Sequence, residues 1–232
     1  MLIVITGGTK GIGRATAIKF AQNKYDIALC SRNADDASTF AAELAALYSV
    51  KTLGMGADLS IKSEILAFGN AVLQKWENVD ILVNNAGVFL AGPIFEEPDG
   101  HLEKMMETNL YSAYHLTRLL IGSLKNTGNG QIFNMCSIAS FMAYPNGGSY
   151  SITKFALLGF SKVLRAELMG QNVKVTAVMP GATWSASWDG APFPEERLMR
   201  AEEIASILFD TAQLHPTAVV EEIIIRPLLG DL

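Results

Sequence analysis

The chain has 232 residues, a net charge of −5 and a sequence pI near 5.2. Half of its residues are hydrophobic and 18% are charged, which is enough apolar material for one large buried core. It has no lysine- or arginine-rich block, so a nucleic-acid partner is not expected. No apolar run approaches the roughly 18 residues of a membrane helix. The composition predicts a soluble, cytoplasmic protein.

Cysteine and histidine are scarce. Cys30 and Cys136 each lie inside an apolar, strand-like stretch, which favours two reduced core residues over a disulfide. The three histidines have no ligand-like spacing to one another or to a cysteine. No metal site is therefore expected.

Short apolar runs rich in valine and isoleucine alternate with longer stretches that have helical spacing. Strands that are apolar on both faces and separated by helices indicate a parallel sheet covered on both sides. We expect an α/β fold, a single doubly wound (Rossmann) domain over residues 1–232 with about seven parallel strands and helices on both faces. The expected strands are 2–6, 25–31, 50–58, 80–87, 130–137, 173–181 and 218–227.

A glycine-rich turn, "ITGGTKGIGRA", joins the first expected strand to the first helix. Glycine has no Cβ, so it accepts positive φ and lets backbone N–H groups approach a phosphate closely. The positive end of the helix dipole adds to the attraction. The position of the turn predicts a pyrophosphate site.

The spacing of this turn is T-G-x-x-x-G-x-G, from Thr6 to Gly13, and several further motifs follow it along the chain. They are NNAG at 84–87, Asn109, Ser137 at a strand end, YSITK at 150–154 and PG at 180–181. In this order and register they resemble the short-chain dehydrogenase/reductase family over nearly the whole chain. The resemblance implies a nicotinamide cofactor and the catalytic set Asn109, Ser137, Tyr150 and Lys154.

The same resemblance implies which residues contact the cofactor. They are Gly7, Thr9, Lys10, Gly11, Ile12, Gly13, Ser31, Arg32, Asp58, Leu59, Asn85, Ala86, Gly87, Tyr150, Lys154, Pro180, Gly181, Thr183 and Ser185. After "PG" the family usually has x-V-x-T, with its threonine on the nicotinamide carboxamide. Here Ser185 keeps that hydroxyl, and Thr183 is a second candidate.

The end of the second strand bears on the choice of cofactor. An NAD site usually has an acidic residue there, but this chain has Ser31 and Arg32. A guanidinium pairs with a 2′-phosphate that a carboxylate would repel, and Lys10 can reach the same phosphate. We expect NADP(H). Asp58 resembles the residue that binds the adenine amino group, although it can also cap the following helix.

Tyr150 and Lys154 are four residues apart, so on a helix they share one face. A nearby ammonium stabilises the phenolate and lowers the tyrosine pKa, which suits a general acid for carbonyl reduction. Ser137 can bond and orient the substrate oxygen. In the family, Asn109 supports a helix kink and holds a water that links the lysine to solvent; a buried amide that satisfies backbone groups is the alternative.

Substrate selection is assigned to a short loop at 182–200 and to the stretch after NNAG. The expected pocket residues are Phe89, Phe141, Tyr144 and Trp188, which form a mostly apolar wall suited to a small uncharged carbonyl. Trp188 either stacks on the substrate ring or packs a lid onto the body of the protein.

These observations predict an NADPH-dependent carbonyl reductase that acts on a small ketone or dicarbonyl. The end of the chain, "VVEEIIIRPLLGDL", and the tryptophans after "PG" resemble the sepiapterin reductase-like branch of the family, which implies a dicarbonyl on a pterin side chain. The alternatives are a 3-oxoacyl thioester reductase and a catalytically silent NADPH-binding sensor. The resemblance also suggests a homodimer or homotetramer that packs through the helices around 102–125 and 150–169.

Overall fold

Seven parallel strands form one sheet in the order β3-β2-β1-β4-β5-β6-β7. The computed structural model describes residues 1–184, 194 and 197–230. The strands are β1 (Leu2–Thr6), β2 (Asp26–Ser31), β3 (Thr52–Gly56), β4 (Ile81–Asn84), β5 (Gly130–Met135), β6 (Val173–Pro180) and β7 (Glu222–Ile225). The predicted doubly wound α/β fold is confirmed. The two edge strands are shorter than predicted, because each pairs with a neighbour on one side only.

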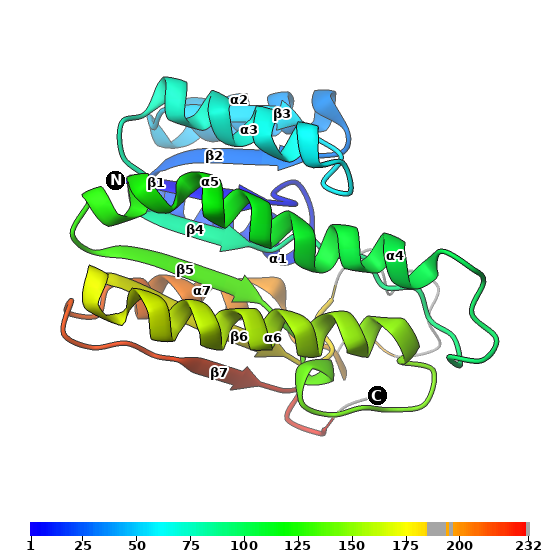
Figure 1. Ribbon diagram of the computed structural model, residues 1–232. Coiled ribbons are helices and arrows are strands. Elements are labelled where there is room, and N and C mark those ends of the chain that lie inside the picture. The colour runs from blue at the N-terminus through cyan, green and yellow to red at the C-terminus, as the bar shows by residue number, and fades with distance from the viewer. Residues whose placement is uncertain (185–193, 195–196, 231–232) are drawn as a thin grey trace.

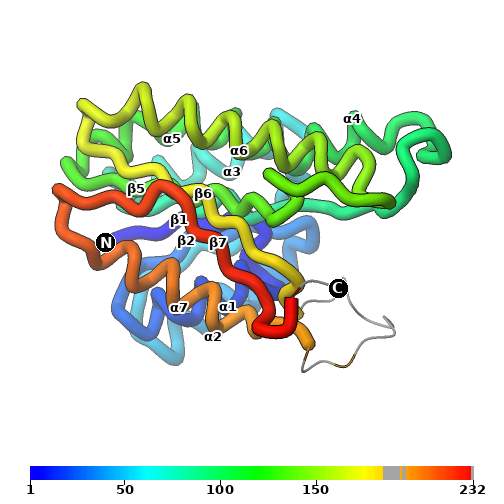
Figure 2. Tube along the Cα trace, turned by 90° about the horizontal axis from the view of Figure 1, so that it is seen from below, coloured from blue at the N-terminus to red at the C-terminus, as the bar shows by residue number. Residues whose placement is uncertain are grey.

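Helices cover both faces of the sheet, as Figures 1 and 2 show. One face carries α1 (Gly11–Gln22), α2 (Ala34–Tyr48) and α7 (Ala201–Ala212). The other carries α3 (Lys62–Lys75), α5 (Ser112–Asn126) and α6 (Gly148–Leu168), with the short α4 (His101–Met106) leading into α5. No helix in the described part of the chain combines the length and the hydrophobicity needed to cross a bilayer.

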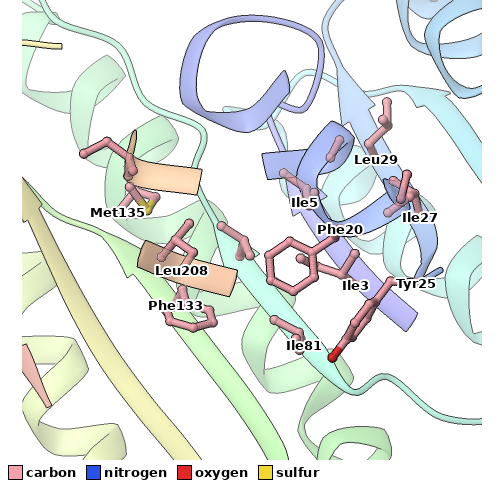
Figure 3. Close-up of a cluster of buried hydrophobic side chains, with 14 of the residues drawn as sticks. Ile3, Ile5, Phe20, Tyr25, Ile27, Leu29, Ile81, Phe133, Met135 and Leu208 are labelled. Atoms are coloured by element: carbon pink, nitrogen blue, oxygen red, sulfur yellow. The ribbon is translucent and has the colours of Figure 1, made fainter. Parts of the chain in front are cut away.

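The core has two main layers because strand side chains alternate between the faces of the sheet. Ile3 and Ile5 of β1 point toward α1, whereas Leu2 and Val4 point toward α3 and α5. Figure 3 shows the first layer, where Phe20 of α1 lies among the strand side chains and is fully buried. Each fully buried side chain of this kind contributes about 1.5–3 kcal/mol to folding.

A row of buried amides crosses the middle of the sheet near its carboxyl edge, the edge at which the strands end. Asn84 of β4 and Asn134 of β5 are register partners, and the Asn84 amide donates to Asn134 Oδ1 at 2.8 Å and to Thr117 Oγ1 at 3.0 Å. The Asn134 amide in turn donates to Ser161 Oγ at 2.8 Å. These bonds fix the end of β4, where the NNAG segment begins, between α5 and α6.

The order of the strands brings the functional loops together. The chain reverses direction across the sheet at β1, which lies between β2 and β4. In open α/β sheets, ligands bind at such a switch point, outside the carboxyl ends of the strands. The turns after β1, β4, β5 and β6 all emerge at this edge, on the right of Figure 1. Both cysteines are buried and free, as expected.

Candidate active site

The glycine turn after β1 leaves the start of α1 open to an anion. Gly7 has φ +64°, and a Cβ on Gly13 would overlap the carbonyl oxygen of Gly7 and the amide of Asn85. The N-cap residue Lys10 makes no side-chain cap bond, and no acidic residue lies in the first turn of α1. The first N–H groups of a helix then remain available to a phosphate.

The NNAG segment holds this turn in place. Asn85 Nδ2 donates to the carbonyl oxygens of Thr6 at 2.9 Å and Gly7 at 3.1 Å. The Thr6 hydroxyl accepts hydrogen bonds from the N–H groups of Asn85 at 2.9 Å and Ala86 at 3.0 Å. Thr6 was not among the predicted site residues, although it begins the glycine motif. Its position directly before the first glycine could have indicated that its hydroxyl holds the turn.

Cations surround the end of β2. Arg32 and Lys10 are both exposed, while Ser31 directs its hydroxyl to the Asn33 carbonyl at 2.8 Å. Hydrogen bonds from Ser60 hold the pKa of the Asp58 carboxyl below its usual range, and the charges of Arg32 and then Lys104 act in the same direction.

Asp58 does not cap the next helix, so that alternative is wrong. Its Oδ1 accepts from the Ser60 N–H at 2.9 Å and the Ser60 hydroxyl at 2.7 Å. The N-cap residue of α3 is Ile61, which lies three residues further on. The Asx turn at Asp58 leaves the next residue, Leu59, buried against the core.

Three of the expected catalytic side chains meet at the carboxyl edge. The hydroxyl of Ser137, which follows β5, lies close enough to the phenol of Tyr150 on α6 to act on its pKa. The Nζ atom of Lys154, one turn along α6, lies 5.6 Å from the centre of the Tyr150 ring. This lysine is buried and donates to the carbonyl oxygen of Met135 at 2.7 Å.

The electrostatics of this group differ from the sequence prediction. Burial raises the pKa of Tyr150, and the opposing effect of the Ser137 hydroxyl is smaller. Burial also lowers the pKa of Lys154 to about 8. The predicted net lowering of the Tyr150 pKa is therefore wrong for the protein by itself, because burial penalises the charged phenolate more than its neighbours stabilise it.

Asn109 lies in a π-helical turn, Glu107–Tyr111, between α4 and α5, so the expected irregularity in the helix is present. Its Oδ1 accepts from the Val88 N–H at 2.7 Å, and its Nδ2 donates to the Val88 carbonyl and the Thr153 hydroxyl, both at 3.0 Å. Asn109 thereby satisfies buried backbone groups, as the alternative interpretation held. The linking water stays a prediction.

Aromatic side chains stand beside Tyr150. The Phe89 ring meets the Tyr150 ring edge-on, with centroids 4.9 Å apart. Tyr144 is close enough for its pKa to be raised by Tyr150, although its own burial is the larger cause. Phe141 is partly exposed nearby in the sequence. Trp188 lies outside the described residues.

The segment after "PG" is described only as far as residue 184. Gly181 is anchored by its N–H to the Ile225 carbonyl at 2.8 Å. Thr183 is buried and its hydroxyl donates to the Gly181 carbonyl at 3.0 Å, so its free capacity is as an acceptor. Ser185, the first candidate for the carboxamide contact, lies outside the described residues.

Comparison with known proteins decides the family. The model of the short chain dehydrogenase family matches residues 1–191. The chain belongs to the short-chain dehydrogenase family. It is therefore an oxidoreductase that acts on alcohol or carbonyl groups with a nicotinamide cofactor. Its glycine turn fits that cofactor, because Gly7 holds a positive φ and the first N–H groups of α1 have no side-chain cap that would compete with a phosphate.

Among relatives of this short-chain dehydrogenase, sepiapterin reductase from Chlorobaculum tepidum is 31% identical and covers 100% of this chain and 98% of its own. Alcohol dehydrogenase from Thermococcus sibiricus, solved with 5-hydroxy-NADP, has TM-score 0.92 and 28% identity over 100% of this chain and 98% of its own. L-sorbose reductase from Gluconobacter frateurii, solved with NADPH and L-sorbose, has TM-score 0.89 and 26% identity over 100% of this chain and 97% of its own.

Proposed function

We propose that this short-chain dehydrogenase reduces a small ketone or dicarbonyl with NADPH, and that Tyr150 is the general acid. The observation that carries the proposal is the meeting of Ser137, Tyr150 and Lys154 at the carboxyl edge of the sheet. The raised pKa of Tyr150 keeps the phenol protonated at neutral pH, which is the form that a proton donor needs.

The side chains then have distinct roles. Ser137 donates a hydrogen bond to the substrate oxygen and orients it toward the phenol. Tyr150 passes its proton to that oxygen as negative charge develops there. Lys154, held by the Met135 carbonyl, stabilises the phenolate that remains. The hydride comes from the bound dihydronicotinamide.

NADPH is the proposed cofactor because the exposed Arg32 follows β2, where an NAD site has an acid, and the exposed Lys10 lies in the glycine turn after the neighbouring strand β1. Two structural neighbours are complexes with NADPH or an NADP derivative, which supports the same choice. Arg32→Ala should weaken NADPH binding about 10- to 100-fold, the range of one charge-assisted hydrogen bond, and leave NADH binding unchanged. Equal affinity of the wild type for both cofactors, measured by calorimetry, would contradict this.

For the substrate, we propose a dicarbonyl carried by a flat ring such as a pterin. Phe89 and Tyr144 beside Tyr150 offer the apolar aromatic wall that such a ring needs. The 31% identical relative named sepiapterin reductase supports this choice over other carbonyls. Trp188 is a further proposed contact, and the loop at 182–200 is proposed to select the substrate.

The test is NADPH oxidation against sepiapterin, small diketones, aromatic aldehydes and an acetoacetyl thioester. We expect the highest kcat/KM for sepiapterin or the diketones, and a loss of at least about 10²-fold in kcat for Tyr150→Phe with unchanged NADPH affinity. Preference for the thioester would instead indicate a 3-oxoacyl reductase. Tight NADPH binding with no turnover of any carbonyl would indicate the sensor.

We also propose that the protein is a homodimer or homotetramer that packs through α5 and α6. An apolar hollow lies on these helices, lined by Leu110, Tyr111, Tyr114, His115, Ala156 and Phe160. Apolar surface of this kind marks interaction sites. Light scattering should show an oligomer that Tyr114→Glu dissociates. The cytoplasmic location stays a prediction.

A further inference from the structure

The helix that carries Tyr150 begins without a cap of its own. Its N-cap residue is Gly147, which has no side chain to accept a hydrogen bond, and no acidic residue lies in its first turn. The first four N–H groups of any helix need outside partners. Tyr150 is the third residue of α6, so an uncapped start would leave the proposed acid in the part of the helix that frays.

Glu97 supplies the missing cap from a segment 52 residues earlier in the chain. Its Oε1 accepts from the Ser149 N–H at 2.9 Å, and its Oε2 accepts from the Ser149 hydroxyl. A carboxylate at this position satisfies an N–H group and also interacts favourably with the helix dipole. These bonds lower the pKa of Glu97, and His101 on α4 adds a smaller effect in the same direction.

The glycine before Ser149 makes room for this carboxylate. Gly148 has φ +22°, and a Cβ at this position would overlap Glu97 Oε1 and come within 2.8 Å of the Gly92 carbonyl oxygen. The backbone is therefore shaped for a group that arrives from another element. The contact is not a chance approach of two surface side chains.

Glu97 lies near the end of the long segment 88–100, which is also held at Asn109 in the π-helical turn and at Asn146 just before α6. The segment begins at Val88, both of whose backbone groups bond to Asn109. Its Gly92 N–H donates to the Asn146 carbonyl at 3.1 Å. Between these points, Phe89 lies edge-on to Tyr150. One segment thus places both a pocket wall and the cap of the catalytic helix.

We propose that Glu97 is a positioning residue for the reaction: it caps α6 in place of a local residue and so fixes Tyr150 and the Phe89 wall relative to each other. The proposal rests on Tyr150 as the general acid. Loss of the cap lets the first turn of α6 and segment 88–100 move apart, which misplaces the proton donor relative to the carbonyl. Misplacement of this kind slows the chemical step even when the cofactor stays bound.

The experiment compares Glu97→Ala and Glu97→Gln with Glu96→Ala, its matched control. Glu96 is the adjacent, exposed carboxylate, so its loss removes the same charge without the cap. We expect Glu97→Ala to lower kcat/KM for the best carbonyl about tenfold, with a loss in kcat, while NADPH affinity changes less than about twofold. Glu97→Gln keeps an acceptor oxygen and should recover part of this loss. Glu96→Ala should match the wild type.

Hydrogen exchange gives a readout that does not depend on turnover. Glu97→Ala should speed amide exchange in residues 88–100 and 148–152, and Glu96→Ala should not. Unchanged exchange in both segments would show that Glu97 does not cap α6. Faster exchange with unchanged kcat would overturn the positioning role, as would an equal loss of NADPH affinity and turnover. If the wild type reduces no carbonyl, the function of Tyr150 fails while exchange still tests the cap.

Discussion

Asn109→Ala should destabilise the protein more than most single changes, because three hydrogen bonds depend on one buried side chain. Asn109 is 1% exposed and bonds to both backbone groups of Val88 and to the Thr153 hydroxyl. Each bond contributes about 1 kcal/mol net, so the free energy of unfolding should fall by about 3 kcal/mol. In a chain of this size that lowers Tm by about 6–12 °C.

Calorimetry on Asn109→Ala measures this shift, and Asn126→Ala is the control. Asn126 is the exposed last residue of α5, in the same helical stretch, and its removal should shift Tm by less than about 2 °C. Turnover should fall as well, because Val88 precedes the Phe89 wall and Thr153 precedes Lys154. A Tm for Asn109→Ala within about 2 °C of the wild type would refute the reasoning.

Two further predictions concern the charge and the glycine turn of the site. The pKa of Lys154 is about 8 in the folded protein against an ordinary 10.5, so between these pH values the unfolded chain binds one more proton than the folded chain. As the pH rises through this window, the free energy of unfolding of the wild type should rise by up to about 3 kcal/mol relative to Lys154→Met. Urea titrations of both proteins measure this, and the absence of a difference would contradict the prediction. Gly13→Ala should weaken NADPH binding at least about tenfold in calorimetry, because the new Cβ overlaps the Gly7 carbonyl and displaces the turn. Its control is Gly159→Ala on α6, where a Cβ meets no atom within 4 Å; NADPH affinity should stay unchanged there and Tm should rise slightly.

The sequence was sufficient to predict the sheet because strands buried on both faces are almost wholly apolar. The central strands β1, β4, β5 and β6 read this way and were found within a few residues of their observed ends. The ends of β3 and β7 were less accurate, because an edge strand is partly exposed and its pattern merges with the following turn. Where an edge strand stops depends on its single neighbour.

The candidate site was also predicted only in part: the positions of its residues were predicted, but the effects of their surroundings were not. Spacing alone placed Tyr150 and Lys154 on one face of a helix and Ser137 at a strand end. It gave no information on desolvation, which is a property of the folded surroundings and which reversed the expected change in the Tyr150 pKa. Glu97 was also missed. The run "IFEEPDG" offers two adjacent acids, and nothing local indicates which of them reaches a helix 52 residues away.

The central position of β1 has a consequence for synthesis of the chain. β1 is made well before its second neighbour, β4, which begins at Ile81. Until then, only β3, β2 and β1 of this sheet have been made, and β1, which is buried along its whole length in the finished fold, lies at an open edge. Such an edge readily pairs with other chains. Nascent chains that end before residue 81 should therefore be the form of this protein most in need of a chaperone.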